Sequence, residues 1–279
     1  MSRVLLFGAN SMLGWSIFTA GGLEHVTPFC NGRTRPMPPG IARGLHLNDE
    51  SAVRALFERE HPELIIYCAG VCNVANCEQS PEFAHSVNVG GARNVLAHAP
   101  AETRIVYCSS DHVFSGDGGP YDEESPTDPV SVYGRTRVAA EALMLARANT
   151  LVVRTGLWIG PSATGRIGHL DWLRYRHRMG LPMTLVEDEA RSAVWASDAA
   201  RRVVALADSE HTGLRHLTAT RTISRPELAR FLSRYFDIGA EFALQRRRDR
   251  PAPHIGNVEL ATLFSDRLAA PLPSVLDSE

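Results

Sequence analysis

The sequence predicts an α/β fold in which a doubly wound parallel sheet carries helices on both faces. Short apolar runs alternate with helix-like segments through the first 155 residues, as parallel sheets require. The first of these runs leads at once into a glycine-containing turn. At 279 residues, with 44% hydrophobic and 22% charged residues, the chain has room for one large domain and a smaller lobe.

Composition excludes several classes of protein. The 29 basic and 31 acidic residues give a net charge of −2, so no basic excess predicts nucleic-acid binding. No apolar run is long enough for a membrane span, and the apolar start is too short for a signal peptide. We therefore expect a cytoplasmic protein. Every basic residue is arginine, which we attribute to codon usage.

The cysteine pattern argues against both disulfides and metal. Five cysteines are an odd number for a disulfide framework. Cys68, Cys72 and Cys77 are close in sequence, but their spacing does not match the paired Cys-x₂-Cys pattern of zinc sites. We expect thiols in the core or in loops, and no metal.

The N-terminal segment predicts a Rossmann-type dinucleotide site. Arg3–Phe7 is typical of a buried strand, and an apolar helix-like stretch starts at Trp15. Gly8 allows the tight turn between them, Gly14 allows close helix–strand packing, and the helix N-terminus offers N–H groups to a pyrophosphate. The whole turn is assigned to the cofactor: Gly8, Asn10, Ser11, Met12, Leu13 and Gly14.

The next segments continue the alternation. Strands are expected at 25–30, 45–49, 63–70 and 103–110, with Asp49 capping a helix over 50–60 and a second helix over 81–97. Ligands of such sheets bind at the carboxyl ends of the strands. Five further residues are assigned to the cofactor site: Leu47, Cys68, Ala69, Gly70 and Asn88.

The residues after the second strand favour NADP over NAD. An NAD site usually has an acidic residue here to hold the ribose hydroxyls, and none is present. Arg33 can instead hold a 2′-phosphate. A solvated loop arginine and an NAD site remain the alternatives.

Ser110, Tyr133 and Arg137 are the candidate catalytic residues. Ser110 ends the strand at 103–110, and Tyr133 and Arg137 lie four apart on an expected helix, hence on one face. A neighbouring cation stabilises a phenolate, which suits tyrosine for proton transfer. The alternative is an ordinary amphipathic tyrosine beside a surface arginine.

With these motifs the chain resembles the extended short-chain dehydrogenases/reductases, closest to the dTDP-4-dehydrorhamnose reductase family. Residues 109–116, Ser-Ser-Asp-His-Val-Phe-Ser-Gly, resemble the family's S-T-D-Y-V-F-x-G. Residues 133–137, Tyr-Gly-Arg-Thr-Arg, stand on Y-G-x-[ST]-K. Further likenesses cover nearly the whole chain: 87–88, 119–123, 154–160, 192–198 and 250–251.

The resemblance implies an NAD(P)H-dependent reductase of a carbonyl, plausibly on a nucleotide-linked 4-keto-6-deoxy sugar. Ser110, Tyr133 and Arg137 then take the catalytic positions, with Tyr133 as proton donor. Tyr133 and Arg137 are also assigned to the cofactor, with Arg137 holding the ribose hydroxyls and stabilising the phenolate. Asp111, His112 and Trp158 are assigned to the substrate. A homodimer is compatible with this family. The alternative is a dinucleotide-binding regulatory subunit, since the family includes that of methionine adenosyltransferase.

Three departures from the family pattern bear on activity and substrate. Arg137 replaces a lysine, Ser11 a common glycine, and Ala193-Val194 a Pro-Thr pair. Arginine keeps the charge but is a larger, planar donor. The clusters at 174–178 and 246–250 are expected on solvated surfaces, or with one arginine reaching a diphosphate.

The resemblance also predicts the division of the chain. Residues 1–155 form the dinucleotide-binding domain, to which 191–214 return, and residues 156–190 and 215–279 form the smaller C-terminal substrate lobe.

Overall fold

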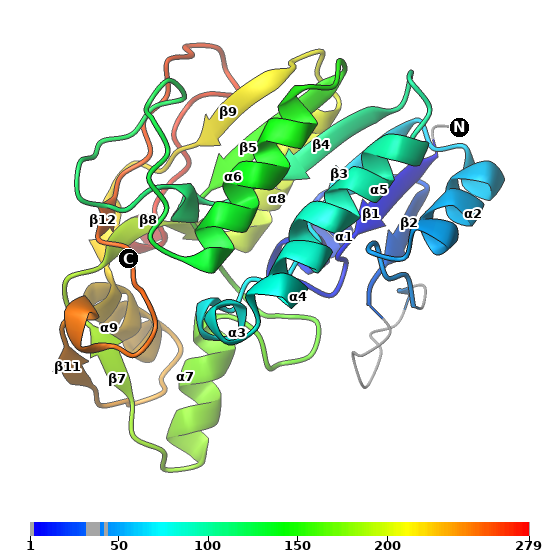
Figure 1. The fold of residues 1–279 in the computed structure, drawn as a ribbon. Helices are drawn as coiled ribbons and strands as arrows, with labels where there is room; N and C mark the ends of the chain where they lie inside the picture. Colours follow the sequence, from blue (N-terminus) through cyan, green and yellow to red (C-terminus); the bar gives the residue numbers. More distant parts are fainter. Residues whose placement is uncertain (1–2, 32–39, 42–43, 279) are drawn as a thin grey trace.

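A parallel six-stranded sheet organises the computed structural model, which describes residues 3–31, 40–41 and 44–278. The strand order is β2-β1-β3-β4-β5-β9, and every neighbouring pair is parallel. The Rossmann-type doubly wound fold is confirmed (Figure 1). Its strands are β1 Val4–Phe7, β2 Val26–Phe29, β3 Leu64–Tyr67, β4 Arg104–Cys108, β5 Thr150–Thr155 and β9 Gly213–Leu217.

Helices cover both faces of this sheet. On one face α1, Met12–Ala20, packs on α8, Ala196–Ala207. The other face is covered by α2, Glu50–Glu60, α5, Gly91–His98, and α6, Val132–Leu145. The apolar strands, buried from both sides, form the core, as parallel strands do. Figure 1 shows α5 and α6 in front of the sheet and α8 behind it.

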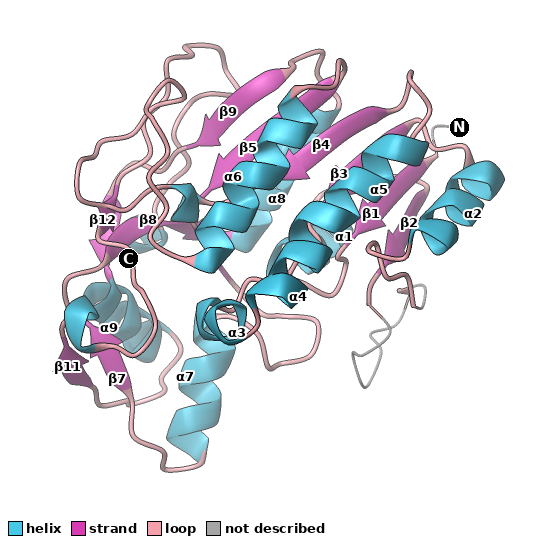
Figure 2. Cartoon of the chain, in the orientation of Figure 1, coloured by secondary structure: helices cyan, strands magenta, loops and turns pink. Residues whose placement is uncertain are grey.

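A second region lies beyond the carboxyl ends of the large sheet's strands (Figure 2). Its strands form two small sheets: β10-β8-β12 with β6 beside β8, and β11-β7. Its own apolar core includes Leu157, Ile223 and Phe231. The elements are β6 Leu157–Ile159, α7 His169–Arg178, β7 Thr184–Val186, β8 Ala190–Trp195, β10 Thr222–Ser224, α9 Arg225–Tyr235, β11 Ala243–Gln245 and β12 Asn257–Val258.

The pairing of the strands shows which part of residues 191–214 returns to the large sheet. β8 pairs with β6, β10 and β12, away from the large sheet, whereas α8 packs on α1 and β9 is an edge strand of the large sheet. The segment that rejoins the large sheet is thus α8 to β9. The division into two domains at the expected residues stays a prediction.

The prediction of a strand at residues 45–49 is wrong. These residues form a turn in which the Asp49 N–H donates to the His46 carbonyl. The Leu47 carbonyl accepts from the Asn94 side chain at 2.9 Å, so a side chain satisfies the backbone that a sheet neighbour would otherwise pair. The cap is confirmed, because Asp49 accepts from the Ala52 N–H at 3.1 Å.

The helix expected over 81–97 is built from three pieces. A π-helical segment, Ser86–Gly90, joins α4, Pro81–His85, to α5. This segment packs against α6, and its residue Asn88 is buried. The helix before it, α3, is Val74–Gln79.

A buried polar network supports the exits of β4 and β5. The Ser109 hydroxyl donates to Glu141 of α6 at 2.5 Å, and Arg154 of β5 forms an ion pair with the same carboxylate at 2.7 Å. The His216 ring lies beside Arg154, with ring nitrogens 3.4 Å from Arg154 Nη1 and 2.9 Å from the Ala261 carbonyl. The network joins the large sheet to the C-terminal segment.

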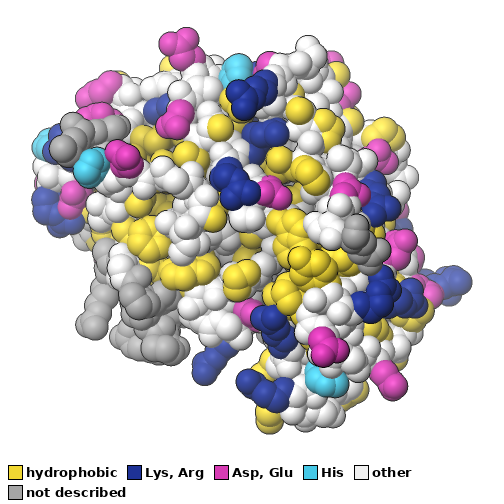
Figure 3. Space-filling model, turned by 180° about the vertical axis from the view of Figure 1, so that it is seen from behind, with side chains coloured by type: hydrophobic (Ala, Val, Ile, Leu, Met, Phe, Trp, Pro, Cys, Tyr) yellow, Lys and Arg dark blue, Asp and Glu magenta, His cyan; other side chains and the backbone are white. Residues whose placement is uncertain are grey.

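The surface carries charges of both signs. On the face seen in Figure 3, arginine and carboxylate side chains are interspersed among apolar ones. Within the described residues, no helix combines the length and hydropathy that a membrane crossing needs.

Gly14→Ala is expected to destabilise the fold, because a methyl group there would collide with the Gly8 carbonyl oxygen. Overpacking of this kind costs about 1–3 kcal/mol. Gly90→Ala is the matched control: its φ is −60°, and no atom beyond its chain neighbours and the backbone of its own helix lies within 4 Å of the added methyl. It should stabilise by roughly 0.5–1 kcal/mol. Urea unfolding measures both, and equal effects of the two substitutions would contradict the packing argument.

The fold should begin to lose stability at pH values above those at which carboxylates titrate. Burial, together with the Arg154 charge, lowers the pKa of His216 to about 4. The unfolded chain then binds more protons than the folded chain, so stability is lost as pH falls from about 6.5 toward 4. One histidine contributes a slope of at most about 1.4 kcal/mol per pH unit.

The test compares the free energy of unfolding at several pH values in wild type, His216→Gln and His177→Gln, an exposed control on α7. The His216 substitution should flatten the slope and the His177 substitution should not. An unchanged slope in His216→Gln would show that this histidine is not held neutral.

Candidate active site

A cavity of about 1330 Å³ runs along the carboxyl edge of the large sheet. Its walls come from the β1–α1 turn, the exits of β3 and β4, the start of α6, and the second region. This is the position at which doubly wound sheets bind ligands. The cavity is large enough for a dinucleotide and a second ligand together, since ordinary ligand pockets span about 300–1,000 Å³.

The β1–α1 turn forms one end of the cavity. Gly8, Asn10, Ser11, Met12 and Leu13 line it. Gly8 has φ +82°, and a Cβ there would lie 2.6 Å from the backbone at Cys68 and Ala69. The chain therefore passes close to β3 only because residue 8 is glycine.

Ser11 takes a different role from the glycine it replaces. Its hydroxyl accepts from the Gly14 N–H at 3.0 Å and caps α1, which starts at Met12 rather than Trp15. Gly14 does not line the cavity but packs against Gly8. The turn thus presents a helix N-terminus to the cavity, which suits an anionic pyrophosphate.

The exit of β3 forms the next wall. Cys68, Ala69 and Gly70 line the cavity, as does Leu47 from the turn before α2. Asn88 lies behind this wall instead of in it. Its side-chain oxygen accepts from the Val71 N–H at 2.8 Å, and its amide donates to the Val71 carbonyl and to Thr136. Asn88 fixes the loop at Val71 that continues this wall of the cavity.

Tyr133 and Arg137 meet on the cavity face of α6. Both line the cavity and are nearly buried, at 6% and 5% exposure. The guanidinium carbon of Arg137 lies 5.2 Å from the Tyr133 ring centroid and 5.8 Å from that of Tyr107. Arg137 also donates to the Tyr107 hydroxyl at 2.8 Å. Burial opposes the charge, but the two tyrosine hydroxyls raise the pKa of Arg137 well above its usual value.

Ser110 lies opposite this pair, at the exit of β4. It lines the cavity, donates to Asp111 at 3.1 Å and accepts from the His112 N–H at 3.2 Å. The structure therefore brings Ser110, Tyr133 and Arg137 to one cavity, from a strand end and a helix start that are far apart in sequence.

The three expected substrate residues have different surroundings. Trp158 and His112 line the cavity, and their buried Nε1 and Nδ1 atoms have no hydrogen-bond partner among the described residues. The His112 ring packs edge-on against Tyr133, 5.2 Å between centroids. Burial, then the charge of Arg191, lowers the pKa of His112 to about 4. Its ring is neutral at pH 7.

Asp111 differs from its assignment. It is fully buried, does not line the cavity and forms a two-point ion pair with Arg191, with Oδ2 2.7 Å from Nε. The Asp111 carboxylate holds Arg191, and Arg191 lines the cavity. Asp111 itself has no surface exposed to the cavity.

A cluster of charges from the second region completes the cavity, and the sequence reasoning missed it. Glu189 lies 3.8 Å from Arg191, 3.5 Å from Arg225 and 2.9 Å from His254. Burial alone would raise the pKa of Glu189, but His254, Arg225 and Arg191 lower it to about 2. The signal in the sequence was the run of three acidic residues at 187–189 followed by Arg191, which does not reveal the partners.

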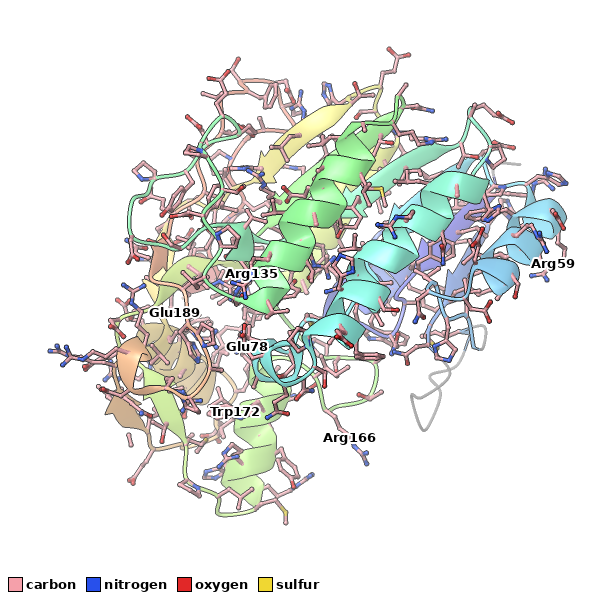
Figure 4. All side chains as sticks on the ribbon, viewed as in Figure 1. Arg59, Glu78, Arg135, Arg166, Trp172 and Glu189 are labelled. Atoms are coloured by element: carbon pink, nitrogen blue, oxygen red, sulfur yellow. The ribbon has the colours of Figure 1, made fainter. Side chains whose placement is uncertain are left out.

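Arginines outnumber carboxylates on this side of the cavity. Arg166 and Arg250 line it together with Arg191 and Arg225. Figure 4 shows Glu189 and Arg166 below the carboxyl edge of the sheet, on the side of α7. Arg250 belongs to the cluster at 246–250, and its buried Nε has no partner among the described residues.

The remaining two expectations concern Arg33 and metal ions. Arg33 lies outside the described residues, so its assignment stays a prediction. Among the residues that the structure describes, no three histidine, cysteine or acidic side chains gather in a way that would hold a metal ion.

Comparison with known proteins gives one family. Residues 2–254 match the family model described as RmlD substrate binding domain. The dTDP-4-keto-6-deoxy-D-glucose reductase of Streptomyces niveus is 30% identical over 271 residues, 94% of this chain and 87% of that protein. Methionine adenosyltransferase 2 subunit beta of Xenopus tropicalis is 34% identical over 146 residues, which are 51% of this chain and 42% of that subunit.

The fold is shared over nearly its full length with a solved structure. The dTDP-4-dehydrorhamnose reductase of Bacillus anthracis, in complex with NADP, superposes with a TM-score of 0.82 at 22% identity, covering 98% of this chain and 96% of that one. By its family match and its full-length relative, the chain belongs to the RmlD-like family of extended short-chain dehydrogenases/reductases.

Proposed function

We propose that the protein is an NADPH-dependent reductase of a carbonyl group on a nucleotide-linked 4-keto-6-deoxy sugar. The observation that carries the proposal is the meeting of Tyr133, Arg137 and Ser110 in a cavity that starts at a glycine turn. A relative that matches 94% of this chain, over 87% of its own length, is named dTDP-4-keto-6-deoxy-D-glucose reductase.

The residues present fit a dinucleotide. The β1–α1 turn leaves no space for side chains at residues 8 and 14, so the backbone can approach a pyrophosphate. Asn31, not a carboxylate, follows β2 and lines the cavity. A neutral amide does not repel a 2′-phosphate, which favours NADP(H), and Arg33 is proposed as its partner.

In the proposed reaction, the catalytic residues supply a proton to the substrate and stabilise the negative charge that this transfer leaves on Tyr133. The bound nicotinamide supplies the hydride for the carbonyl carbon. Tyr133 donates its hydroxyl proton to the carbonyl oxygen, and the fixed charge of Arg137, packed against its ring, stabilises the phenolate. Ser110 turns its hydroxyl from Asp111 to the same oxygen.

The charge of the cavity favours a nucleotide-linked substrate. Among the described residues, four arginines and one carboxylate, Glu189, line the side formed by the second region, and Asp111 pairs with Arg191 from behind the wall. Guanidinium groups bind diphosphates through paired hydrogen bonds. Trp158 and His112 offer unsatisfied nitrogens where a sugar hydroxyl or carbonyl would lie.

The substitution at Arg137 and its contact with Tyr107 favour a second candidate function, that of a regulatory subunit without turnover. Arg137 replaces the family lysine and donates to Tyr107. A relative named methionine adenosyltransferase 2 subunit beta matches about half of this chain. Under this alternative the protein binds a dinucleotide and a partner enzyme without turnover.

The deciding assay follows NADPH and NADH oxidation with dTDP-4-dehydrorhamnose, other nucleotide-linked keto sugars and free keto sugars. We expect saturable turnover with a nucleotide-linked substrate, faster with NADPH. An inert protein that still binds dinucleotide would favour the regulatory alternative, and one that binds neither dinucleotide would contradict both.

Tyr133→Phe should lower kcat on the order of 10² to 10⁴-fold, because the ring still packs while the proton donor is lost. The dinucleotide dissociation constant should change little. Tyr67→Phe is the matched control, since the Tyr67 hydroxyl is buried with no partner among the described residues. Near-normal turnover of Tyr133→Phe would remove the residue from the mechanism.

Arg137→Lys should keep or raise activity, because the charge remains and lysine is the family's own residue. Arg137→Met should reduce kcat and weaken dinucleotide binding. It should also cost about 1–3 kcal/mol of stability, since the buried Tyr107 hydroxyl loses its partner. Arg135→Met, on the exposed side of α6, is the control. Unchanged turnover in Arg137→Met, measured beside this control, would contradict the assigned role.

A further inference from the structure

Two thiols lie side by side on the floor of the cavity. Cys68 and Cys108 follow the paired residues Tyr67 and Tyr107 of the neighbouring parallel strands β3 and β4. Their sulfur atoms are 3.6 Å apart. Both are nearly buried, at 8% and 4% exposure, yet both line the cavity. Neither is needed by the reaction described above.

The backbone geometry at this position suits a covalent link. Neighbouring strands lie about 4.8 Å apart, and disulfides join Cα atoms separated by about 4.4–6.8 Å. The two residues directly follow aligned positions of neighbouring strands. Their sulfurs, 3.6 Å apart, have to approach to a bond length of about 2.05 Å for the link to form.

We propose that Cys68 and Cys108 form a reversible disulfide, a redox modification site reached through the dinucleotide end of the cavity. The oxidant is a small disulfide such as glutathione disulfide, or a peroxide. The link would tie the exit of β3, which backs the Gly8 turn, to the exit of β4, which carries Ser109 and Ser110.

The exchange is balanced with glutathione disulfide as oxidant. One protein thiol, as thiolate, attacks a glutathione sulfur and releases one glutathione thiolate. The second protein thiol then attacks the protein sulfur of the mixed disulfide and releases the other. The two protein thiols lose two electrons and two protons, and two glutathione thiols are formed. The hydrogen bond with Cys108, then burial, raises the pKa of Cys68, so the exchange is slow at neutral pH.

The other described cysteines are placed differently. Cys72 is exposed, and Cys77 donates to the Val71 carbonyl at 3.6 Å. Cys30 follows β2, which β1 separates from β3 in the sheet. Cys68 and Cys108 are thus the two described cysteines that directly follow the aligned pair Tyr67 and Tyr107 and whose sulfur atoms are close.

The test incubates the full chain with glutathione disulfide and maps its peptides by mass spectrometry without reduction. We expect a peptide linking residues 68 and 108, lost on adding dithiothreitol. Cys68→Ala and Cys108→Ala should each abolish it, while Cys72→Ala and Cys77→Ala should retain it. A link that joins other cysteines, or two free thiols at 68 and 108 after Cys72 has reacted, would overturn the proposal.

A second arm tests the route of access and rests on the proposed dinucleotide binding. NADPH at about 100 times its dissociation constant leaves about 1% of the protein free, so the link should form about 100-fold more slowly. Oxidation at the same rate in saturating NADPH would overturn access through the cavity. The dissociation constant is measured separately by fluorescence titration, so a chain that binds no dinucleotide contradicts the proposed function while the first arm still tests the link.

Discussion

The buried guanidinium of Arg137 constrains the whole active site. A charge at 5% exposure is costly unless neighbouring groups compensate it. Here two aromatic faces and the Tyr107 hydroxyl do so. The wall opposite must also be bare, because a Cβ at Gly70 would lie 2.5 Å from Arg137 Nη2. The strand β4, the β3 exit and the helix α6 are therefore all fitted to one cation.

A second set of compensated charges fixes the other side of the cavity. Asp111 holds Arg191, and Glu189 is shared by Arg191, Arg225 and His254. These contacts join the exit of β4, a strand of the large sheet, to β8 and α9 of the second region. Because each charge is paired, the second region is held against the large sheet by polar contacts as well as by packing. The arginines remain at the cavity wall, where an anionic substrate would meet them.

Sequence reasoning predicted the features that depend on local chemistry. The glycine turn, the cap at Asp49 and the shared face of Tyr133 and Arg137 follow from spacing alone, and the structure places them as expected. It failed where distant residues decide the outcome. Residues 45–49 look like a strand, but they form a turn, and the Asn94 side chain pairs with the Leu47 carbonyl. The partner of Asp111 could not be foreseen either, because Arg191 lies 80 positions away; the substrate role that the resemblance implies for Asp111 stays a prediction.

The most direct measurement follows the hydrogen that the enzyme is proposed to transfer. Wild-type protein is incubated with dTDP-4-dehydrorhamnose and NADPH that carries deuterium on the transferred side of the nicotinamide C4. The account predicts that deuterium appears at C4 of the sugar, and that Tyr133→Phe suppresses this transfer. Saturable NADPH binding with no deuterium in any nucleotide-linked keto sugar would contradict it.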